Sequence, residues 1–408
     1  MGREEFFKAI KDTIESIKPI GRRGGSTLLI HHDEADGICS AAIALKALES
    51  IGFTVKSVCL EKLYREVLEE IYSKSAYDII VFTDIGSAHA GYISKLNVDN
   101  IPTIILDHHK PEKSSNPSVF NLSPDLYGID GDEVSASTVT YIFAKTIHPK
   151  LEDLSYLALI GSAEIPGPLK GLDLEAAMDA IRIGAAEPSG RNDYRIKAMG
   201  KPLSYKRLST ILSILGSVGY YRGGPILGLK ACLEGLTDQI ESFASKLEEE
   251  RKEANRKLLS KLYKSGLNID GYTQWFHAGN TFSSMGVKVI GSFCSYLKYQ
   301  RSIVRQDLYI IGFMNMSREI PGFNPLRSDY SKISGRLPDK LESDVRNGLK
   351  PPLSTIIPIA CEAHGGFGDG HISAASGIIL KGREEDFIGT FNKLISEYSR
   401  VSANTKIV

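Results

Sequence analysis

Short apolar runs alternate with stretches of helical periodicity over the first third of the chain. The runs at residues 27–30, 78–83 and 102–106 have the length and composition of buried strands. Strands that alternate with helices predict a parallel, doubly wound α/β sheet with its loops gathered at the carboxyl ends of the strands. The predicted helices are residues 6–17, 38–48, 62–72 and 88–96.

The pattern changes towards the C-terminus. Residues 236–262 carry one apolar stripe among dense charges, which predicts a long connecting helix. After Gly266 the chain predicts a smaller α/β domain. From the length of the chain we expect two α/β domains joined by a helical insert and connector, with boundaries at residues 1–195, 196–266 and 267–408. Two further helices are predicted at 135–144 and 154–163, strands at 286–290, 308–314 and 332–336, and a glycine-rich turn at 365–371.

Polar residues follow each of the first three predicted strands. The first strand leads into His32, Glu34 and Asp36, the second into Asp84, and the third into Asp107, His108 and His109. A single Asp after a strand is more often a helix cap or a turn former than a ligand. Three such loops in succession, two of them rich in His, favour convergence on one or two divalent ions such as manganese or zinc.

The glycine-rich segment 365–371 has two interpretations. Glycine serves any tight turn with positive φ, so the segment could carry no ligand. Alternatively, exposed backbone amides and His371 could bind a phosphate, with Ser334 and Arg336 as further donors. The basic stretch 191–207 is interpreted as solvated surface, and Tyr220 and Tyr221 as packing residues rather than base-stacking platforms.

The composition of the chain limits its possible partners and its cellular location. The 49 basic and 49 acidic residues balance, so binding to nucleic acid would need a local basic patch. The five cysteines are scattered and form neither a zinc ribbon nor a disulfide framework, which favours a reducing, cytoplasmic location. No run approaches the roughly 20 apolar residues that span a bilayer, so we expect no membrane partner.

Together these motifs resemble those of the DHH phosphoesterases. His32-x-Glu34-x-Asp36-Gly37, Asp84 and Asp107-His108-His109 are similar to the first three motifs of that family. The segments 332–336 and 365–377 resemble its associated C-terminal DHHA1 domain, and the order and spacing, with the segment 219–224, are most similar to the archaeal RecJ-like branch.

The resemblance implies a clamp around single-stranded DNA or RNA, with Mn²⁺ or Mg²⁺ in the first domain and phosphate contacts from the second. It also implies association with the GINS complex beside the replicative helicase, in DNA replication or repair. The implied metal ligands are His32, Glu34, Asp36, Asp84 and His108, the implied catalytic residues are His109 and Asp107, and the implied substrate-binding residues are Ser334, Arg336, Gly368, Gly370 and His371.

Two positions depart from the family pattern. Glu34 stands where the family has Asp, and Ile165 stands where it has a bridging Asp, four residues after Gly161. Losing a bridging carboxylate weakens a two-ion site, so we expect one ion, or none bound tightly. Alternatively, Glu164 replaces that Asp.

The motifs, together with these two departures, leave three possible functions. The leading hypothesis is a GINS-associated, single-strand-binding protein with reduced metal-dependent exonuclease activity. A second is a fully active exonuclease of the same family. A third is a phosphodiesterase of small nucleotides, either nanoRNA or a cyclic dinucleotide. A basic cleft that extends from the metal site would favour the first two functions, and a closed pocket would favour the third.

Overall fold

A computed structural model describes residues 2–73 and 76–405 of the chain. The chain divides into two compact units, and the boundary falls inside one long helix, α10 (Asp238–Ser265). The first unit comprises residues 1–247 and 321–324, and the second comprises residues 248–320 and 325–408. The three-part division expected from the sequence remains a prediction.

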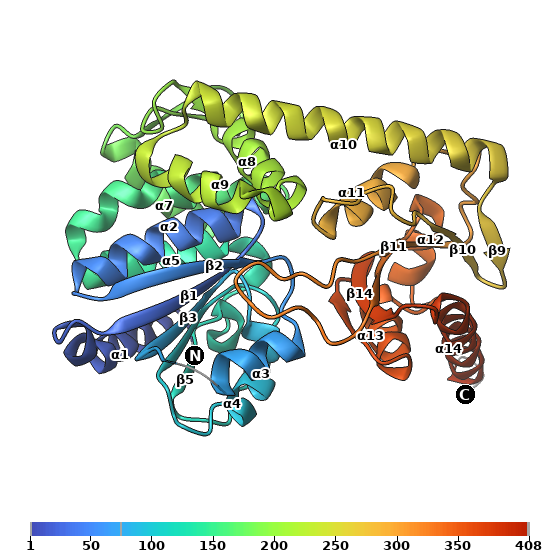
Figure 1. Cartoon of the computed structure of the whole chain (residues 1–408), viewed down its shortest axis with the longest axis horizontal. Helices are drawn as coiled ribbons and strands as arrows, with labels where there is room; N and C mark the ends of the chain where they lie inside the picture. The colour runs from blue at the N-terminus through green and yellow to red at the C-terminus, as the bar shows by residue number, and fades with distance from the viewer. Residues whose placement is uncertain (1, 74–75, 406–408) are drawn as a thin grey trace. The chain divides into compact units, whose positions relative to one another are not determined.

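A five-stranded parallel sheet organises the first unit (Figure 1). Its strand order is β2-β1-β3-β4-β5, so the winding reverses between β1 and β3. In such sheets, ligands bind beyond the carboxyl ends of the strands at this reversal. The strands are β1 (Ser26–His32), β2 (Thr54–Leu60), β3 (Ile79–Thr83), β4 (Thr103–Leu106) and β5 (Val119–Asn121).

Helices cover both faces of this sheet. On one face the side chains of Val81 and Ile104 join a core with α1 (Arg3–Gly21), α2 (Ala35–Ser50) and α5 (Ala136–Ile147). On the other face the hydroxyl of Tyr72, from α3 (Arg65–Ser73), lies 3.0 Å from the Thr103 hydroxyl. The remaining helices of the first part of the chain are α3 (Arg65–Ser73), α4 (Ala90–Leu96), α6 (Ser155–Gly161), α7 (Gly171–Arg182), α8 (Tyr205–Ser213) and α9 (Gly224–Glu234).

A π-helical segment, Ile214–Val218, follows α8 and touches the loop after β1. A Cβ placed on Gly216 would lie 1.6 Å from the carbonyl oxygen of Asp33, so only glycine fits this close approach. Tyr220, just beyond, is 2% exposed and donates its hydroxyl to the Cys59 carbonyl. Its packing role therefore agrees with the interpretation from the sequence. A small antiparallel sheet precedes α8, formed by β6 (Ala186–Pro188), β7 (Tyr194–Ile196) and β8 (Leu203–Ser204).

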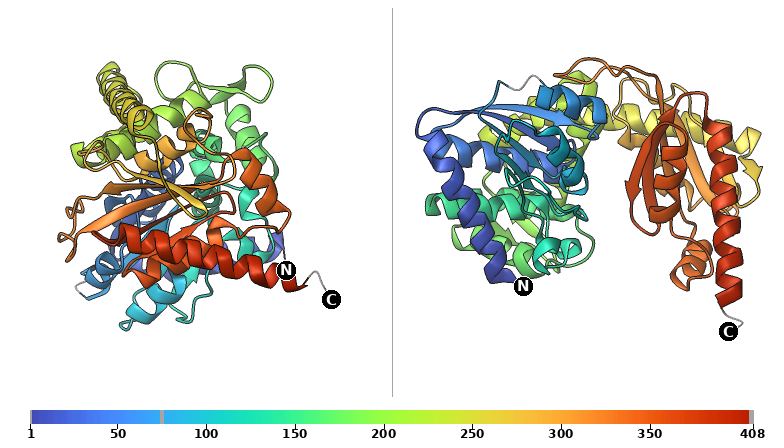
Figure 2. Two further views of the ribbon diagram at one scale, coloured as in Figure 1. Left: turned by 90° about the vertical axis from the view of Figure 1, so that its right-hand side faces the viewer. Right: turned by 90° about the horizontal axis from the view of Figure 1, so that it is seen from below.

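The second unit is built on a mixed six-stranded sheet of order β13-β14-β12-β11-β10-β9. One core contains Phe313 together with Phe387 and Phe391 of the C-terminal helix α14, drawn in red alongside the strands in Figure 2. The strands are β9 (Asn268–Asp270), β10 (Thr273–His277), β11 (Tyr309–Asn315), β12 (Tyr330–Arg336), β13 (Phe367–Gly370) and β14 (Ala374–Leu380). The helices are α11 (Lys288–Leu297), α12 (Asp339–Arg346), α13 (Leu353–Ala363) and α14 (Glu384–Thr405).

The structure corrects two expectations in this unit. Residues 286–290 were predicted to form a strand, but they lead into and begin helix α11. The buried residues of α11 recur at helical spacing beyond the predicted run, at Phe293, Cys294 and Leu297, which a short β-branched window hides. The glycine-rich turn is also shorter than expected, because Phe367–Gly370 pairs with β14 as an edge strand.

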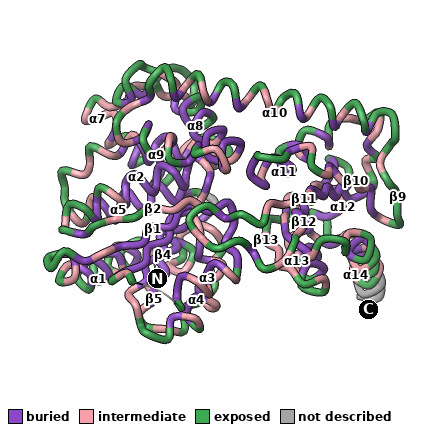
Figure 3. Tube along the Cα trace, in the orientation of Figure 1, coloured by how far each residue is buried: buried purple, intermediate pink, exposed green. Residues whose placement is uncertain are grey.

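The predicted fold class is confirmed. A doubly wound parallel sheet, a helical connector and a smaller α/β unit follow one another along the chain. Figure 3 shows the inner strands of the two larger sheets as mostly buried and the length of α10 as largely exposed or intermediate. Among residues 2–73 and 76–405, no helix combines the length and the apolar character needed to cross a membrane.

Candidate metal centre

The candidate site lies where the first sheet reverses its winding. The carboxyl ends of β1 and β3 are adjacent, with His31 opposite Thr83, and β4 continues the order with Leu106 opposite Thr83. The polar residues that follow these three strands therefore share one edge of the sheet. This is the convergence that the sequence pattern predicts.

Asp84 stands at the centre of the site with an unusual backbone. Its φ is 58°, in the left-handed region that non-glycine residues rarely occupy, although Asp tolerates it better than most. The side chain is 3% exposed. Burial and the nearby Asp36 carboxylate raise the pKa of Asp84 well above its usual range, and the two imidazoles of the triplet only partly oppose this. A buried carboxylate with raised pKa gains most from a nearby cation.

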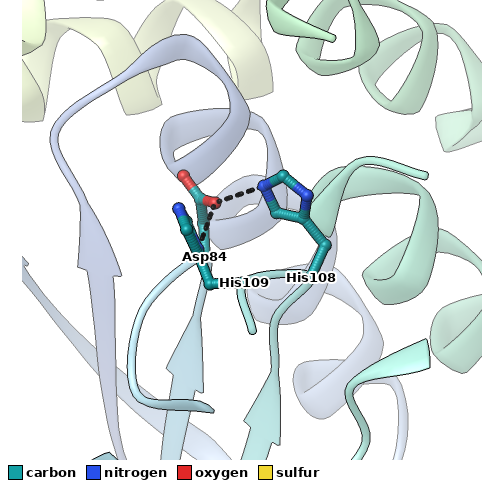
Figure 4. Close-up of side chains that lie close together, drawn as sticks. All are labelled: Asp84, His108 and His109. Carbon is teal, nitrogen blue, oxygen red and sulfur yellow. Dashed lines mark ion pairs between the residues drawn. The ribbon is translucent and has the colours of Figure 1, made fainter. Parts of the chain in front are cut away.

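His108 points one ring nitrogen at Asp84 (Figure 4). Its Nδ1 lies 3.0 Å from the carbonyl oxygen of Gly131, which can only accept, so Nδ1 carries the proton. In the neutral ring the other nitrogen, Nε2, then carries the lone pair, and it lies 3.7 Å from Asp84 Oδ1 and 3.9 Å from Asp36 Oδ2. A backbone contact that fixes the tautomer in this way is typical of histidines that bind metals.

His109 is held by its neighbour Asp107. The imidazole Nδ1 lies 2.7 Å from Asp107 Oδ1, which also accepts from the backbone N–H of both histidines. Burial would raise the pKa of Asp107, but His109, His108 and the Ser87 N–H lower it well below its usual range. Asp107 is thus an anion that orients His109. The His109 side chain is 43% exposed, so it can meet both an ion and a substrate.

Asp84, His108 and His109 can present one ligand atom each within 4.8 Å of one another. One carboxylate and two imidazoles suit a borderline divalent ion such as Mn²⁺ or Zn²⁺. Two members of this group, Asp84 and His108, were predicted from the sequence to be metal ligands. The third, His109, was predicted to be a catalytic residue. Among the described residues it is the group with ligand geometry for a metal.

The other predicted ligands of the first loop lie around this group. His32 Nδ1 is 3.3 Å from Asp84 Oδ2, and its Nε2 is 3.3 Å from the buried carboxylate of Asp33. His32 therefore contacts the central carboxylate from the β1 side. Glu34 is half-buried at the residue before α2 and is not part of the three-residue ligand group.

Asp36 is drawn into capping a helix. Its Oδ2 and Oδ1 accept from the backbone N–H groups of Ala136 and Ser137, both at 2.8 Å, at the start of α5. A Cβ on Gly161 would lie 2.6 Å from Asp36 Oδ1, so this glycine leaves room for the carboxylate. Asp36 remains close to His108, but both of its carboxylate oxygens already accept hydrogen bonds from backbone N–H groups.

Glu164 is a site residue that the sequence raised only as an alternative. Its Oε1 accepts from the Ala35 N–H at 3.0 Å and from the Ser213 hydroxyl at 2.8 Å. Burial, followed by the charges of Asp36 and Asp84, raises its pKa. Glu164 thus brings a further, half-buried carboxylate to the start of α2. The signal in the sequence was its place three residues after Gly161; nothing in the sequence placed it against Ala35.

The predicted substrate-binding residues lie in the second unit. Arg336 is mostly buried, and it donates from Nε to Ser295 Oγ at 2.8 Å and from Nη1 to Ser334 Oγ at 3.0 Å. Burial lowers its pKa. Ser334 and Arg336 are thus brought together on β12, whereas Gly368 and Gly370 lie on the edge strand β13, two strands away. His371 is exposed just after that strand.

The first unit matches a known family. The sequence model described as "DHH family, N-terminal domain" matches residues 26–162, which contain all three polar strand ends. The sheet and its site therefore define a DHH-family domain. A stretch of 162 residues is also 26% identical to the single-stranded-DNA-specific exonuclease RecJ of Thermus thermophilus, covering 36% of this chain and 24% of that protein. The chain therefore contains a DHH-family domain and is similar to RecJ.

Solved structures share the fold over most of the chain. RecJ of Thermus thermophilus in complex with Mn²⁺ superposes with a TM-score of 0.64 and 16% identity, covering 96% of this chain and 55% of that chain. CDC45 from Entamoeba histolytica gives 0.56 and 11%, covering 96% and 99%. At these identities the likeness is one of fold. The chain spans about half of that RecJ chain, and the stretch matched in sequence spans 24% of the curated relative.

Proposed function

We propose that this protein binds single-stranded DNA or RNA and holds one divalent ion, Mn²⁺ or Mg²⁺, with exonuclease activity below that of a two-ion enzyme. The observation that carries the proposal is the composition of the ligand group, which has a single carboxylate, Asp84, with two imidazoles. A two-ion phosphoryl-transfer site needs carboxylates that bridge the ions. The nearby Asp36 is engaged by two backbone N–H groups, and Glu164 by one backbone N–H and one hydroxyl.

The residues around the group suit phosphodiester chemistry. A divalent ion held here would supply positive charge to a phosphoryl group and make a nearby water more acidic. Asp107 binds the Nδ1 of His109 and leaves Nε2 available, either as a ligand to the ion or, where the ion is held without it, as a group that takes or gives a proton. Its exposed position would let it reach a substrate. In the second unit, Arg336 and Ser334 would bind phosphate, with His371 and the amides of Gly368 and Gly370 as further contacts.

A second candidate function is a fully active exonuclease. Glu164 favours it, because this carboxylate lies close enough to Asp36 and Asp84 for their charges to raise its pKa. Release of the Glu164 contacts to Ala35 and Ser213 would free a carboxylate for a second ion. The two functions differ in rate and in the number of ions bound.

The proposal is tested with end-labelled single-stranded DNA and RNA in the presence of Mn²⁺. The wild type, Asp84→Asn and the surface control Asp99→Asn are compared. Slow degradation by wild type and Asp99→Asn, lost in Asp84→Asn, supports a weak site at Asp84. Turnover of about 10 per second, an ordinary enzyme rate, would contradict the reduced activity. Degradation that survives Asp84→Asn would contradict the site itself.

The family resemblance and the shared fold support a further part of the proposal, an association with the GINS complex and the replicative helicase in replication or repair. The interaction is tested by co-purification of the tagged full chain from its native host. Recovery of GINS subunits with the wild type at stoichiometric levels is the expected result. If GINS subunits are absent, the proposed association with GINS is refuted, whereas the proposed binding of nucleic acid is unaffected.

A further inference from the structure

Three exposed tyrosines gather on the second unit. Tyr263 and Tyr296 are each 49% exposed and Tyr299 is 61% exposed, and these are the large exposed aromatic side chains among the described residues. Tyr263 comes from α10, while Tyr296 and Tyr299 come from the end of α11 and the residues after it. We call these three residues the tyrosine patch. Single exposed apolar residues are ordinary, but a group of aromatic rings is not.

Hydrogen bonds connect the segments that carry the patch. The Tyr263 hydroxyl donates to Gln300 Oε1 at 3.0 Å and accepts from Ser302 Oγ at 3.3 Å, which fixes this ring beside the segment that follows Tyr299. Tyr296 and Tyr299 are three residues apart, and the Tyr299 N–H donates to the Tyr296 carbonyl at 3.3 Å. At this spacing in a helical turn, two side chains lie on the same face. The three rings therefore belong to one surface.

The segment that carries the patch is basic. Residues 271–306 contain four Lys or Arg residues and no Asp or Glu, although the whole chain has 49 of each sign. Lys298 Nζ lies 5.0 Å from the centre of the Tyr299 ring and 3.6 Å from Asp339 Oδ1, so its charge is already paired. Arg301 is exposed, and it forms no ion pair with any residue in the described ranges. Cations interleaved with open aromatic rings suit a polyanion that carries flat bases.

The patch is linked to the arginine proposed to bind phosphate. Arg336 Nε donates to Ser295 Oγ, one residue before Tyr296. A strand whose backbone reaches Arg336 would thus pass next to α11. An acidic, apolar protein surface could pair with the positive charges, but it would not need cations and aromatic rings to alternate along one segment. The phosphates and bases of a nucleic acid alternate in this way, so the observations favour nucleic acid.

We infer that the tyrosine patch is a stacking platform for the bases of a single strand, with the exposed Arg301 holding its phosphates. The inference rests on the proposed function and deepens it. The platform is independent of sequence, because every base has a face on which an aromatic ring can stack. The patch would hold the strand without taking part in hydrolysis.

The test measures binding of a fluorescein-labelled single-stranded oligothymidylate to the full chain by anisotropy, with EDTA present so that the strand is not cut. Tyr299→Ala and Tyr296→Ala should each weaken binding by about fivefold or more, while Tyr299→Phe, which keeps the ring, should bind as wild type does. Ile226→Ala, which removes an even more exposed apolar side chain from the first unit, is the matched control and should have no effect.

An abasic oligonucleotide separates stacking from charge. It keeps the phosphates and lacks the bases, so wild type and Tyr299→Ala should bind it equally, whereas Arg301→Ala should bind it more weakly and lower the salt dependence by about one charge. Equal binding of the normal strand by wild type and both alanine variants would overturn the patch alone. If wild type binds no single strand at all, the proposed function itself fails.

Discussion

Asp107 fixes His109 through a 2.7 Å contact between its Oδ1 and the imidazole Nδ1. The same oxygen accepts the backbone N–H groups of both histidines of the triplet, at 2.8 and 3.2 Å. One buried anion thus sets the backbone of the loop, the tautomer of His109 and the charge that stabilises a protonated ring. Carboxylates behind metal-binding histidines commonly act in this way.

Asp107→Asn should weaken Mn²⁺ binding by about 10- to 100-fold, because the amide keeps an acceptor oxygen but loses the charge that supports His109. Isothermal titration with Mn²⁺ measures the change. The exposed control Asp99→Asn should bind as wild type does. Unchanged affinity in Asp107→Asn would show that Asp107 has a structural role only.

Asp84→Asn should stabilise the metal-free protein while it abolishes metal binding. The substitution removes a buried charge with a raised pKa, and Asn tolerates the left-handed φ of 58°. We expect a gain of about 1 kcal/mol or more in the free energy of unfolding, measured in urea with EDTA. Asp84→Ala, which tolerates this φ poorly, should be less stable than Asp84→Asn by about 1 kcal/mol. Loss of stability in both variants would contradict the claim that charge repulsion at Asp84 destabilises the metal-free protein.

Gly216→Ala should destabilise the first unit by about 3 kcal/mol or more, because the new Cβ would lie 1.6 Å from the Asp33 carbonyl oxygen. Thermal unfolding gives the size of the effect. Gly389→Ala in α14 is the matched control, since a Cβ there meets no atom within 4 Å. That control should be neutral or slightly stabilising, by up to about 1 kcal/mol. Similar effects at both positions would contradict the close contact between the π-helical segment and the loop after β1.

These contacts mark the limit of what the sequence could predict. The apolar runs that end at His32, Asp84 and Asp107 predicted the strands and the common edge where their side chains meet, because parallel strands place their ends together. The capping of α5 by Asp36 joins residues 100 apart, and the contact of Glu164 with Ala35 joins residues 129 apart. Such contacts depend on packing, which periodicity does not encode. The same reason explains why the β-branched start of α11 was predicted to be a strand.

Asp173 should make stability depend on pH between about 4 and 6. Burial raises its pKa from 3.8 to about 6, against hydrogen bonds from Thr138 and Ser135. Because the folded state prefers the protonated acid, its contribution to stability is greatest below pH 4 and is lost as the pH rises through 6. The loss is about 3 kcal/mol at most.

Asp173→Asn keeps an oxygen that can accept from Ser135 and removes the titration. The stability of the variant relative to wild type should therefore rise between pH 4 and pH 7.5, measured by urea unfolding in EDTA. A difference between the two proteins that does not change with pH would contradict the raised pKa of Asp173.

The number of Mn²⁺ ions bound per chain tests the central claim most directly. Titration of the metal-free protein, followed by electron paramagnetic resonance of free Mn²⁺, should give one ion, lost in Asp84→Asn and retained in Glu164→Gln. Two ions per wild-type chain, falling to one in Glu164→Gln, would contradict the account and assign Glu164 to a complete two-ion centre.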